Sequence, residues 1–332
     1  MTASAPAFPA DAIRIRGLSK TYASRNGQPP KQALKGVDLT IPRGSFFGLL
    51  GPNGAGKSTL INIMAGLVKK TAGQVEIWDR DLDRDERGAR LAIGIVPQEL
   101  NLDPFFTPRE LLEVQAGLYG VPRSERRTDE ILATVGLSDK ADAYARTLSG
   151  GMRRRLLVAK AMVHFPPILV LDEPTAGVDI ELRQQLWTQI RAMNERGTTI
   201  LLTTHYLEEA QELCDQIAII NHGSVVACEP TEALIGRLDS KTLTVMLTEP
   251  LSEIPSALQA FGAEKARRGN GLVLRYRPSE TAIAEILATI SAAGLTIADL
   301  ITDEADLEDI FLQLTRSTAA QADAITLQTG YP

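Results

Sequence analysis

A short glycine-rich run in the first quarter of the chain has the residue types that hold phosphate groups. The run is Gly51, Pro52, Asn53, Gly54, Ala55, Gly56, Lys57, Ser58 and Thr59, and it fits the pattern G-x-x-x-x-G-K-[ST]. Its glycines let backbone N–H groups curl around phosphates, and a following helix N-terminus adds partial positive charge. Lys57 is expected to reach the β- and γ-phosphates, and the Ser58 hydroxyl to ligate Mg²⁺. The run therefore predicts a P-loop that binds Mg-ATP.

Two acidic residues, Asp172 and Glu173, follow the apolar run Ile168–Leu171. Because a buried strand exposes polar groups only at its end, we expect Asp172 to lie beside the P-loop and to hold Mg²⁺ through water. Glu173 points elsewhere and can polarise a water molecule against the γ-phosphate. Acidic pairs also occur as ordinary caps, but a pair that follows a P-loop in the same sheet favours ATP hydrolysis.

Apolar runs and helical patterns alternate around these residues. Runs with the length of buried strands are Ser45–Leu50, Ile93–Val96, Ile168–Leu171, Thr199–Thr203 and Ile217–Ile220, and Ile13–Leu18 alternates like a strand. Helical patterns are Lys57–Leu67, Arg109–Tyr119, Ser124–Val135, Arg153–Val163 and Ile180–Glu195. Such alternation predicts an α/β domain with a parallel sheet covered on both faces. Thr21–Lys31 is predicted to be a polar loop, and residues of about 99–165 a helical subdomain.

The composition changes near Leu238, which predicts a second domain. Beyond it, Lys241–Leu247, Gly271–Tyr276 and Leu295–Ile301 have strand patterns, and Ile254–Phe261, Ser279–Ala293 and Asp306–Arg316 have helical ones. We therefore expect a main domain over residues 11–238 and a small α+β domain over 239–316. Residues 1–10 are predicted to be a flexible N-terminus, and 317–332 a mobile tail because they show no clear periodicity.

The overall composition argues against several classes of protein. The net charge is −6, from 35 basic and 41 acidic residues, so no nucleic-acid partner is expected. The two cysteines, Cys214 and Cys228, cannot form a disulfide framework and indicate a reducing compartment. Met1–Ala10 lacks the features of a secretory signal, and no apolar run approaches the roughly 18 residues of a membrane span.

Further motifs surround the P-loop and the acidic pair in a fixed order. They are Tyr22 in Lys20-Thr21-Tyr22, Gln98, the run Leu148, Ser149, Gly150, Gly151 and Met152, then Asp179 in Ala176-Gly177-Val178-Asp179, and His205 after Thr203-Thr204. As a set, these motifs resemble those of the ABC ATPases over roughly Ile13–Leu238. The resemblance implies a P-loop ABC ATPase domain with a parallel-sheet core, a helical subdomain and N-terminal antiparallel strands.

The same resemblance implies a role for each motif. Tyr22 stacks on adenine, Gln98 contacts ATP and Mg²⁺, Asp179 lies in the D-loop, and His205 is the switch histidine that assists Glu173. The Leu148–Met152 signature acts on the ATP held by the partner's P-loop, so a second copy of the chain is required. Met152 replaces the commoner glutamine, and the D-loop departs from its usual wording; we expect hydrolysis to be intact at both sites of the homodimer.

The branch of the family is indicated by two further segments. Thr204–Ala210 with Leu213-Cys214-Asp215, and Leu307–Leu314 near the C-terminus, resemble the ATPases of ABC-2-type exporters, which include drug-resistance and nodulation lipo-oligosaccharide exporters. This resemblance implies a separate polytopic permease and a place on the cytoplasmic face of the inner (plasma) membrane. The alternatives are an importer ATPase and a non-transport ABC ATPase.

Two adjacent aromatic residues, Phe105 and Phe106, are flanked by prolines between Gln98 and Tyr119. One hypothesis is that one of these rings lines a groove for a cytoplasmic helix of the permease. The alternative is that both rings pack inside the helical subdomain, since aromatic side chains are mostly core residues.

Overall fold

The computed structural model describes residues 8–24, 29–178, 180–237, 241–251, 253–266, 270–304 and 307–315. These residues form two compact units, with the division between Thr231 and Glu232. The predicted division near Leu238, the predicted tail 317–332 and most of the predicted N-terminus 1–10 lie outside the described residues.

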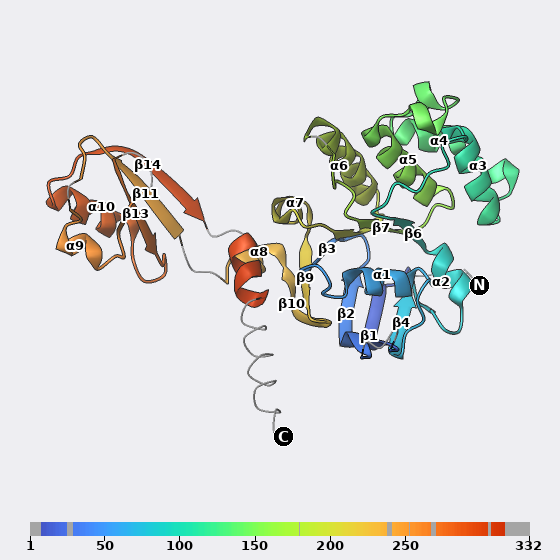
Figure 1. Cartoon of the computed structure of the whole chain (residues 1–332), viewed down its shortest axis with the longest axis horizontal. Coiled ribbons are helices and arrows are strands. Elements are labelled where there is room, and N and C mark those ends of the chain that lie inside the picture. Colours follow the sequence, from blue (N-terminus) through green and yellow to red (C-terminus); the bar gives the residue numbers. More distant parts are fainter. Residues whose placement is uncertain are drawn as a thin grey trace, which may run out of the picture. The chain divides into compact units, whose positions relative to one another are not determined.

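An antiparallel sheet of four strands opens the first unit (Figure 1). Its strands are β1 (Asp11–Tyr22), β2 (Lys31–Pro42), β4 (Ala72–Ile77) and β5 (Arg80–Asp81), in the order β2-β1-β4-β5. The pairing of β1 with β2 continues as far as Tyr22 and Lys31, so the polar loop predicted from Thr21 to Lys31 is shorter than expected. The side chains of both residues are exposed, and this end of the ladder therefore shows no hydrophobic alternation.

A second sheet of six strands forms the centre of this unit. Its strands are β3 (Phe46–Leu50), β6 (Ile93–Val96), β7 (Ile168–Asp172), β8 (Thr199–Thr203), β9 (Gln216–Asn221) and β10 (Ser224–Pro230), in the order β10-β9-β3-β8-β7-β6. All are parallel to their neighbours except β10, which runs antiparallel to β9. The predicted α/β fold, with a parallel-sheet core and N-terminal antiparallel strands, is confirmed. Parallel strands end at one edge, and the loops after β3, β6, β7 and β8 therefore meet there.

Helices surround the central sheet (Figure 1). They are α1 (Lys57–Met64), α2 (Glu86–Leu91), α3 (Pro108–Leu118), α4 (Thr128–Thr134), α5 (Gly150–Met162), α6 (Ile180–Glu195) and α7 (Leu207–Leu213), with single 3₁₀ turns at Arg123–Glu125, Ser138–Lys140 and Ala145–Thr147. Helices α3, α4 and α5 pack together. In the part of the chain that the structure covers, no helix combines the length and apolar character needed to span a membrane.

The helix predicted over Ser124–Val135 is interrupted. A 3₁₀ turn ends at Glu125, and α4 begins only at Thr128. Between them, the Arg126 guanidinium donates to the Val121 carbonyl at 3.1 Å and to Glu113 at 2.7 Å. These bonds link the chain to α3 and to the loop after it at the point where the predicted helix is interrupted.

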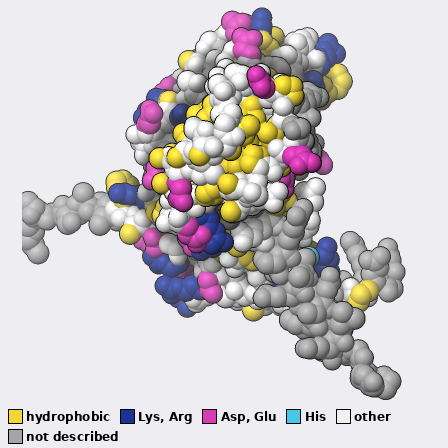
Figure 2. Space-filling view, turned by 90° about the vertical axis from the view of Figure 1, so that its left-hand side faces the viewer, with side chains coloured by type: hydrophobic (Ala, Val, Ile, Leu, Met, Phe, Trp, Pro, Cys, Tyr) yellow, Lys and Arg dark blue, Asp and Glu magenta, His cyan; other side chains and the backbone are white. Residues whose placement is uncertain are grey.

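The second unit repeats a simple pattern of strands and helices. Helix α8 (Thr231–Ile235) begins at the last residue before the division. The elements that follow it are β11 (Lys241–Leu247), α9 (Ser256–Gln259), β12 (Glu264–Lys265), β13 (Gly271–Tyr276), α10 (Ile283–Ala292), β14 (Ile297–Glu304) and a helix over 307–315. The sheet is antiparallel in the order β12-β13-β11-β14, which is the ferredoxin-like arrangement. Figure 2 shows hydrophobic side chains gathered on the face that carries α9 and α10, and the only charged residue of α10 is Glu285.

Candidate active site

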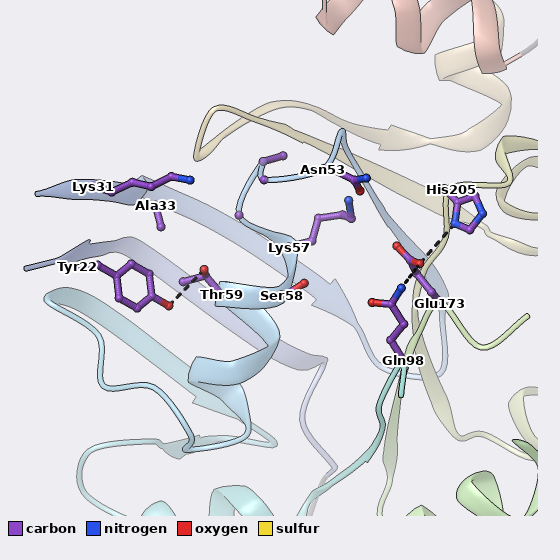
Figure 3. Close-up of a pocket in the computed structure, with 13 residues that line it drawn as sticks. Tyr22, Lys31, Ala33, Asn53, Lys57, Ser58, Thr59, Gln98, Glu173 and His205 are labelled. Carbon is purple, nitrogen blue, oxygen red and sulfur yellow. Dashed lines mark hydrogen bonds and ion pairs between the residues drawn. The ribbon is translucent and has the colours of Figure 1, made fainter. Parts of the chain in front are cut away.

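A cavity of about 690 Å³ lies at the edge of the parallel sheet where the strands end (Figure 3). Its lining residues are Tyr22, Lys31, Ala33, Asn53, Gly54, Ala55, Gly56, Lys57, Ser58, Thr59, Gln98, Glu173 and His205. A volume of this size is typical of sites for cofactors and small substrates. The fold thus brings together predicted site residues that lie up to 183 positions apart, from Tyr22 to His205.

The predicted P-loop follows β3 directly and is seated against two other strands. A Cβ atom on Gly51 would lie 2.2 Å from the Ile220 carbonyl oxygen of β9, so only glycine fits this approach. Gly56 has φ +119°, and a Cβ there would lie 2.8 Å from the Ala33 carbonyl oxygen of β2. The glycines predicted from the motif are therefore required by contacts with distant parts of the chain as well as by the loop's own shape.

Lys57 begins α1, and its ammonium group is held over the loop. It donates to the carbonyl oxygens of Gly51 at 2.6 Å and Pro52 at 3.3 Å. Burial lowers the pKa of Lys57, while the nearby carboxylates of Glu173 and Asp172 act to raise it. A partly desolvated cation beside backbone N–H groups is an arrangement suited to phosphate oxygens.

The Glu173 carboxylate contacts both Gln98 and His205 across the cavity from Tyr22. The Gln98 Nε2 group donates to its Oε2 atom at 2.8 Å, and His205 Nδ1 lies 3.5 Å from the same oxygen. The backbone of Glu173 has φ +48°, an unusual conformation for a residue with a side chain. Its N–H donates to the Thr203 carbonyl at 3.0 Å, which holds this conformation in place. Figure 3 shows Gln98, Glu173 and His205 in line beside Lys57.

Asp172, the neighbouring acid, points in another direction, as expected for consecutive residues at a strand end. Its Oδ1 atom accepts a hydrogen bond from the Thr203 hydroxyl at 2.6 Å. It lines an adjacent cavity of about 490 Å³ rather than the cavity that contains Glu173. Asp172 and Glu173 therefore face different surroundings although they are adjacent in the sequence.

Tyr22 lies at the other end of the cavity from Glu173 (Figure 3). Its side chain is exposed, its hydroxyl lies 3.4 Å from the Thr59 hydroxyl, and the Lys20 ammonium lies 4.8 Å from the ring centroid. Lys31 and Ala33 also line the cavity, and the sequence did not reveal them. Their position depends on the pairing of β1 with β2 across residues 23–30, and no motif signals that pairing.

The predicted signature lies outside this cavity. Ser149 is the N-cap of α5, and its hydroxyl oxygen accepts a hydrogen bond from the Met152 N–H at 3.2 Å. Ser149 and Gly150 are exposed, whereas Leu148 and Gly151 are buried. The cap and the helix N-terminus are thus exposed and are not among the residues that line the P-loop cavity. Asp179, the predicted D-loop residue, lies outside the described residues.

The chain is similar to known ATP-binding proteins of one family. A family model described as "ABC transporter" matches residues 34–176. The Nod factor export ATP-binding protein I of Ralstonia nicotianae is 33% identical over 305 residues, which are 91% of this chain and 93% of that protein. The linearmycin resistance ATP-binding protein LnrL of Bacillus subtilis is 35% identical over 92% of this chain and 99% of its own length. This chain belongs to the ABC transporter family.

Solved structures place the first unit of this ABC protein among known cassettes. The dimeric structure of MJ0796, a bacterial ABC transporter cassette, is 30% identical, with a TM-score of 0.59 over 66% of this chain and 98% of that one. CbiO1 of Clostridium perfringens, part of the complex cbiONQ, is 26% identical, with a TM-score of 0.61 over 69% of this chain and 92% of that one. The protein is an ATPase of the ABC type and binds ATP.

Proposed function

We propose that this ABC ATPase is the motor subunit of an ABC-2-type exporter, in which two copies enclose ATP and drive a separate permease. The similarity to the daunorubicin/doxorubicin resistance ATP-binding protein DrrA of Streptomyces peucetius, 37% identical over 92% of this chain, supports this branch. Similarity of this extent includes the second unit as well as the cassette. For the chemistry, the proposal is carried by one observation, the Glu173 carboxylate held by Gln98 and His205 beside Lys57.

In this proposal the cavity binds ATP along its length. Tyr22 stacks on the adenine ring, and the backbone N–H groups of Gly51–Thr59 surround the phosphates. Lys57 exchanges its bonds to the Gly51 and Pro52 carbonyls for bonds to the β- and γ-phosphate oxygens. Tyr22 and Glu173 lie at opposite ends of the cavity (Figure 3), which supports a pose with the adenine ring near Tyr22 and the γ-phosphate near Glu173.

The residues at the site are suited to bind Mg²⁺ together with the phosphates of ATP. Among the described residues, no cluster of three or more His, Cys, Asp and Glu side chains could hold a metal by itself. This suits Mg²⁺, which keeps several waters and uses few protein ligands together with phosphates. The ligands proposed are the Ser58 hydroxyl, the Gln98 amide oxygen and, through water, the Asp172 carboxylate. Bound there, Mg²⁺ would neutralise charge on the phosphate oxygens.

Hydrolysis is assigned to Glu173 acting as a general base. Its Oε2 atom is engaged by Gln98 and His205, which orients the carboxylate and leaves Oε1 to accept a proton from water. The water oxygen attacks the γ-phosphorus, the bond to the β–γ bridging oxygen breaks, and ADP leaves with that oxygen. His205 is proposed to contact the γ-phosphate while it keeps Glu173 oriented.

The dimer is proposed because the start of the signature is exposed and does not line its own cavity. Ser149 and Gly150 at the N-terminus of α5 can offer a hydroxyl, N–H groups and a helix dipole to a phosphate bound by a second copy. Gly151, Leu148 and Met152 then support this surface, and Asp179 is proposed to act between the subunits. The MJ0796 cassette, which this chain resembles, has a dimeric structure.

The permease is proposed to hold this ABC ATPase at the cytoplasmic face of the inner membrane. Phe105 is 69% exposed, and its ring lies 5.8 Å from the Arg146 guanidinium. The alternative that both aromatic rings pack inside the helical subdomain is therefore wrong for Phe105. Its exposure supports the hypothesis that this ring receives a helix of the permease.

The test uses a Glu173→Gln variant that binds ATP and hydrolyses it slowly. Because the substitution removes the proposed base and keeps the P-loop, Mg-ATP should hold the variant as a dimer and in complex with its permease. We would capture it with Mg-ATP from detergent-solubilised native membranes and identify the proteins that co-purify. A Lys57→Ala/Glu173→Gln double variant, which loses the phosphate contact, is the matched control.

A polytopic membrane protein recovered with Glu173→Gln and absent from the double variant would support the exporter. Recovery of soluble partners alone, or of nucleic acid, would contradict it and favour the non-transport alternative. Recovery together with a substrate-binding protein would favour the importer.

A further inference from the structure

We propose that Glu209 is a positioning residue for hydrolysis, because its buried carboxylate joins the segment after Glu173 to the segment that carries His205. This inference rests on the function proposed for Glu173 and His205. Glu209 lies in α7 and is 6% exposed. Its neighbour in the sequence, Glu208, is exposed.

One carboxylate oxygen of Glu209 bonds to both segments. The Thr175 hydroxyl donates to Oε2 at 2.9 Å, and the Thr204 hydroxyl donates to the same atom at 3.0 Å. Thr175 is two residues beyond Glu173, and Thr204 immediately precedes His205. A single oxygen atom is therefore shared between the loops that follow β7 and β8, and each of these loops carries one residue of the Glu173–His205 pair.

The other oxygen, Oε1, anchors this junction to α6. The Trp187 indole N–H donates to it at 3.3 Å, and the Arg183 Nε atom lies 3.4 Å away. The Arg183 guanidinium also lies 4.4 Å from the centroid of the Tyr206 ring, which in turn packs against the His205 ring with 4.1 Å between centroids. The residue next to His205 is thus held from the same helix as the carboxylate.

A carboxylate satisfies every donor at this junction. A buried charge is tolerated when it is paired and hydrogen-bonded, and Glu209 has three hydrogen-bond donors and one guanidinium around it. An ionised carboxylate accepts at both oxygens and donates at neither, so it can take two hydroxyl donors on one atom. A hydrocarbon side chain here would leave Thr175, Thr204 and Trp187 without their acceptor.

The geometry that depends on this junction is the approach of His205 to Glu173. Their contact is 3.5 Å between Nδ1 and Oε2, and the His205 side chain is 53% exposed, so its own packing constrains it weakly. Glu173 sits in an uncommon left-handed backbone conformation that the surroundings must maintain. Fixing Thr175 and Thr204 to one atom restricts both loops at once. The P-loop makes none of the contacts described for Glu209, so ATP affinity should not depend on it.

The test compares steady-state ATP hydrolysis by full-length variants, with active sites counted by stoichiometric ATP binding. Glu209→Ala should lower kcat about tenfold or more, as expected when catalytic groups lose their positions, with the KM for ATP within about twofold of the parent value. Glu209→Gln keeps an amide oxygen that accepts both hydroxyl groups, but its NH₂ group would face the Trp187 N–H and Arg183, so it should lower kcat less than Glu209→Ala does. Glu208→Ala, an adjacent glutamate lost from the exposed side of α7, is the matched control and should behave as the parent.

A second pair of variants tests the shared oxygen directly. Thr175→Val removes the hydroxyl at nearly constant shape and should lower kcat several-fold, whereas Thr175→Ser, which keeps it, should not. In a Glu209→Ala background, Thr175→Val should cause no further loss, because the two changes break the same contact.

Parent-like kcat in Glu209→Ala, or equal losses in Glu209→Ala and Glu208→Ala, would overturn the inference. A lower fraction of active sites with unchanged kcat per site would also overturn it, because that result assigns Glu209 to folding alone. Glu173→Gln measured beside them separates the two levels of argument. If it loses hydrolysis while Glu209→Ala does not, the inference alone fails; if it hydrolyses normally, the proposed base fails and the inference with it.

Discussion

The stack of His164 on Tyr119 makes a specific prediction about acid stability. The two rings are parallel to within 5°, with 3.8 Å between centroids. His164 Nε2 lies 3.2 Å from the Ile93 carbonyl oxygen, so it carries the ring proton and donates. The Nδ1 atom is buried and has no hydrogen-bond partner among the described residues. A second proton would therefore place a charged N–H group where nothing accepts it.

Burial lowers the pKa of His164 from 6.5 to about 4. The unfolded chain binds this proton below pH 6.5, while the folded chain binds it only near pH 4. Stability is therefore present above pH 6.5 and is lost as the pH falls toward 4. Between pH 7.5 and 5.0 the shift corresponds to about 2 kcal/mol of unfolding free energy, and partial contact of the ring with solvent reduces this to about 1–2 kcal/mol.

The assay is urea unfolding followed by tryptophan fluorescence at these two pH values. Both tryptophans, Trp78 and Trp187, lie in the first unit, so the signal reports the unit that contains His164. The comparison variant is His164→Phe, which keeps a flat ring against Tyr119 and cannot bind a proton. It loses the bond to Ile93, but that cost is the same at both pH values.

The parent should lose about 1–2 kcal/mol more than His164→Phe when the pH falls from 7.5 to 5.0. Groups other than His164 are common to the two proteins and cancel in this difference. Equal losses in the parent and the variant would refute the reasoning, since His164 would then accept its proton in the folded state as readily as in the unfolded one.

Two further predictions concern ATP binding. Gly56→Ala should raise the KM for ATP at least tenfold or abolish activity, because its Cβ would lie 2.8 Å from the Ala33 carbonyl oxygen. Gly54→Ala should cost only about 1 kcal/mol of loop stability, because its φ is +79° but nothing lies within 4 Å of the added Cβ. Similar KM values for the two variants, measured by steady-state hydrolysis, would contradict this. Tyr22→Ala should raise the KM for ATP about tenfold through lost stacking, and Tyr22→Phe, which loses only the contact to Thr59, should not. An unchanged KM in Tyr22→Ala would remove the ring from the binding site.

The parts of the site that the sequence could predict are local in the chain. The P-loop is one continuous run between a strand and a helix, and Asp172 and Glu173 end a strand whose apolar character is visible by itself. Gln98 and His205 follow strands of the same kind. Because parallel strands end at one edge of a sheet, the order of these elements is enough to place the residues near one another. Their chemical roles remain predictions.

The parts that could not be predicted depend on packing between distant segments. Glu208 and Glu209 are adjacent and chemically identical, and only contacts with α6 and with the loops after β7 and β8 distinguish the buried one from the exposed one. Lys31 lies at the cavity because β2 pairs with β1 as far as Tyr22. The residues around Lys31 are polar, so the sequence shows no strand pattern there. The interruption before α4 also coincides with contacts between distant residues, the bonds of Arg126 to Glu113 and Val121, which no helical pattern reveals.

The end of the cavity around Tyr22 affects which nucleoside triphosphate the protein can bind. The described residues that line it offer an aromatic face from Tyr22, a methyl group from Ala33 and an ammonium group from Lys31. Strong discrimination between bases requires buried groups that hydrogen-bond to their edges, and a ring face accepts any base that can stack. If the base stacks on Tyr22 as proposed, guanine should bind here almost as well as adenine. The proposed motor would then hydrolyse whichever purine triphosphate is most concentrated, and its dependence on ATP would follow from the cell's nucleotide pool.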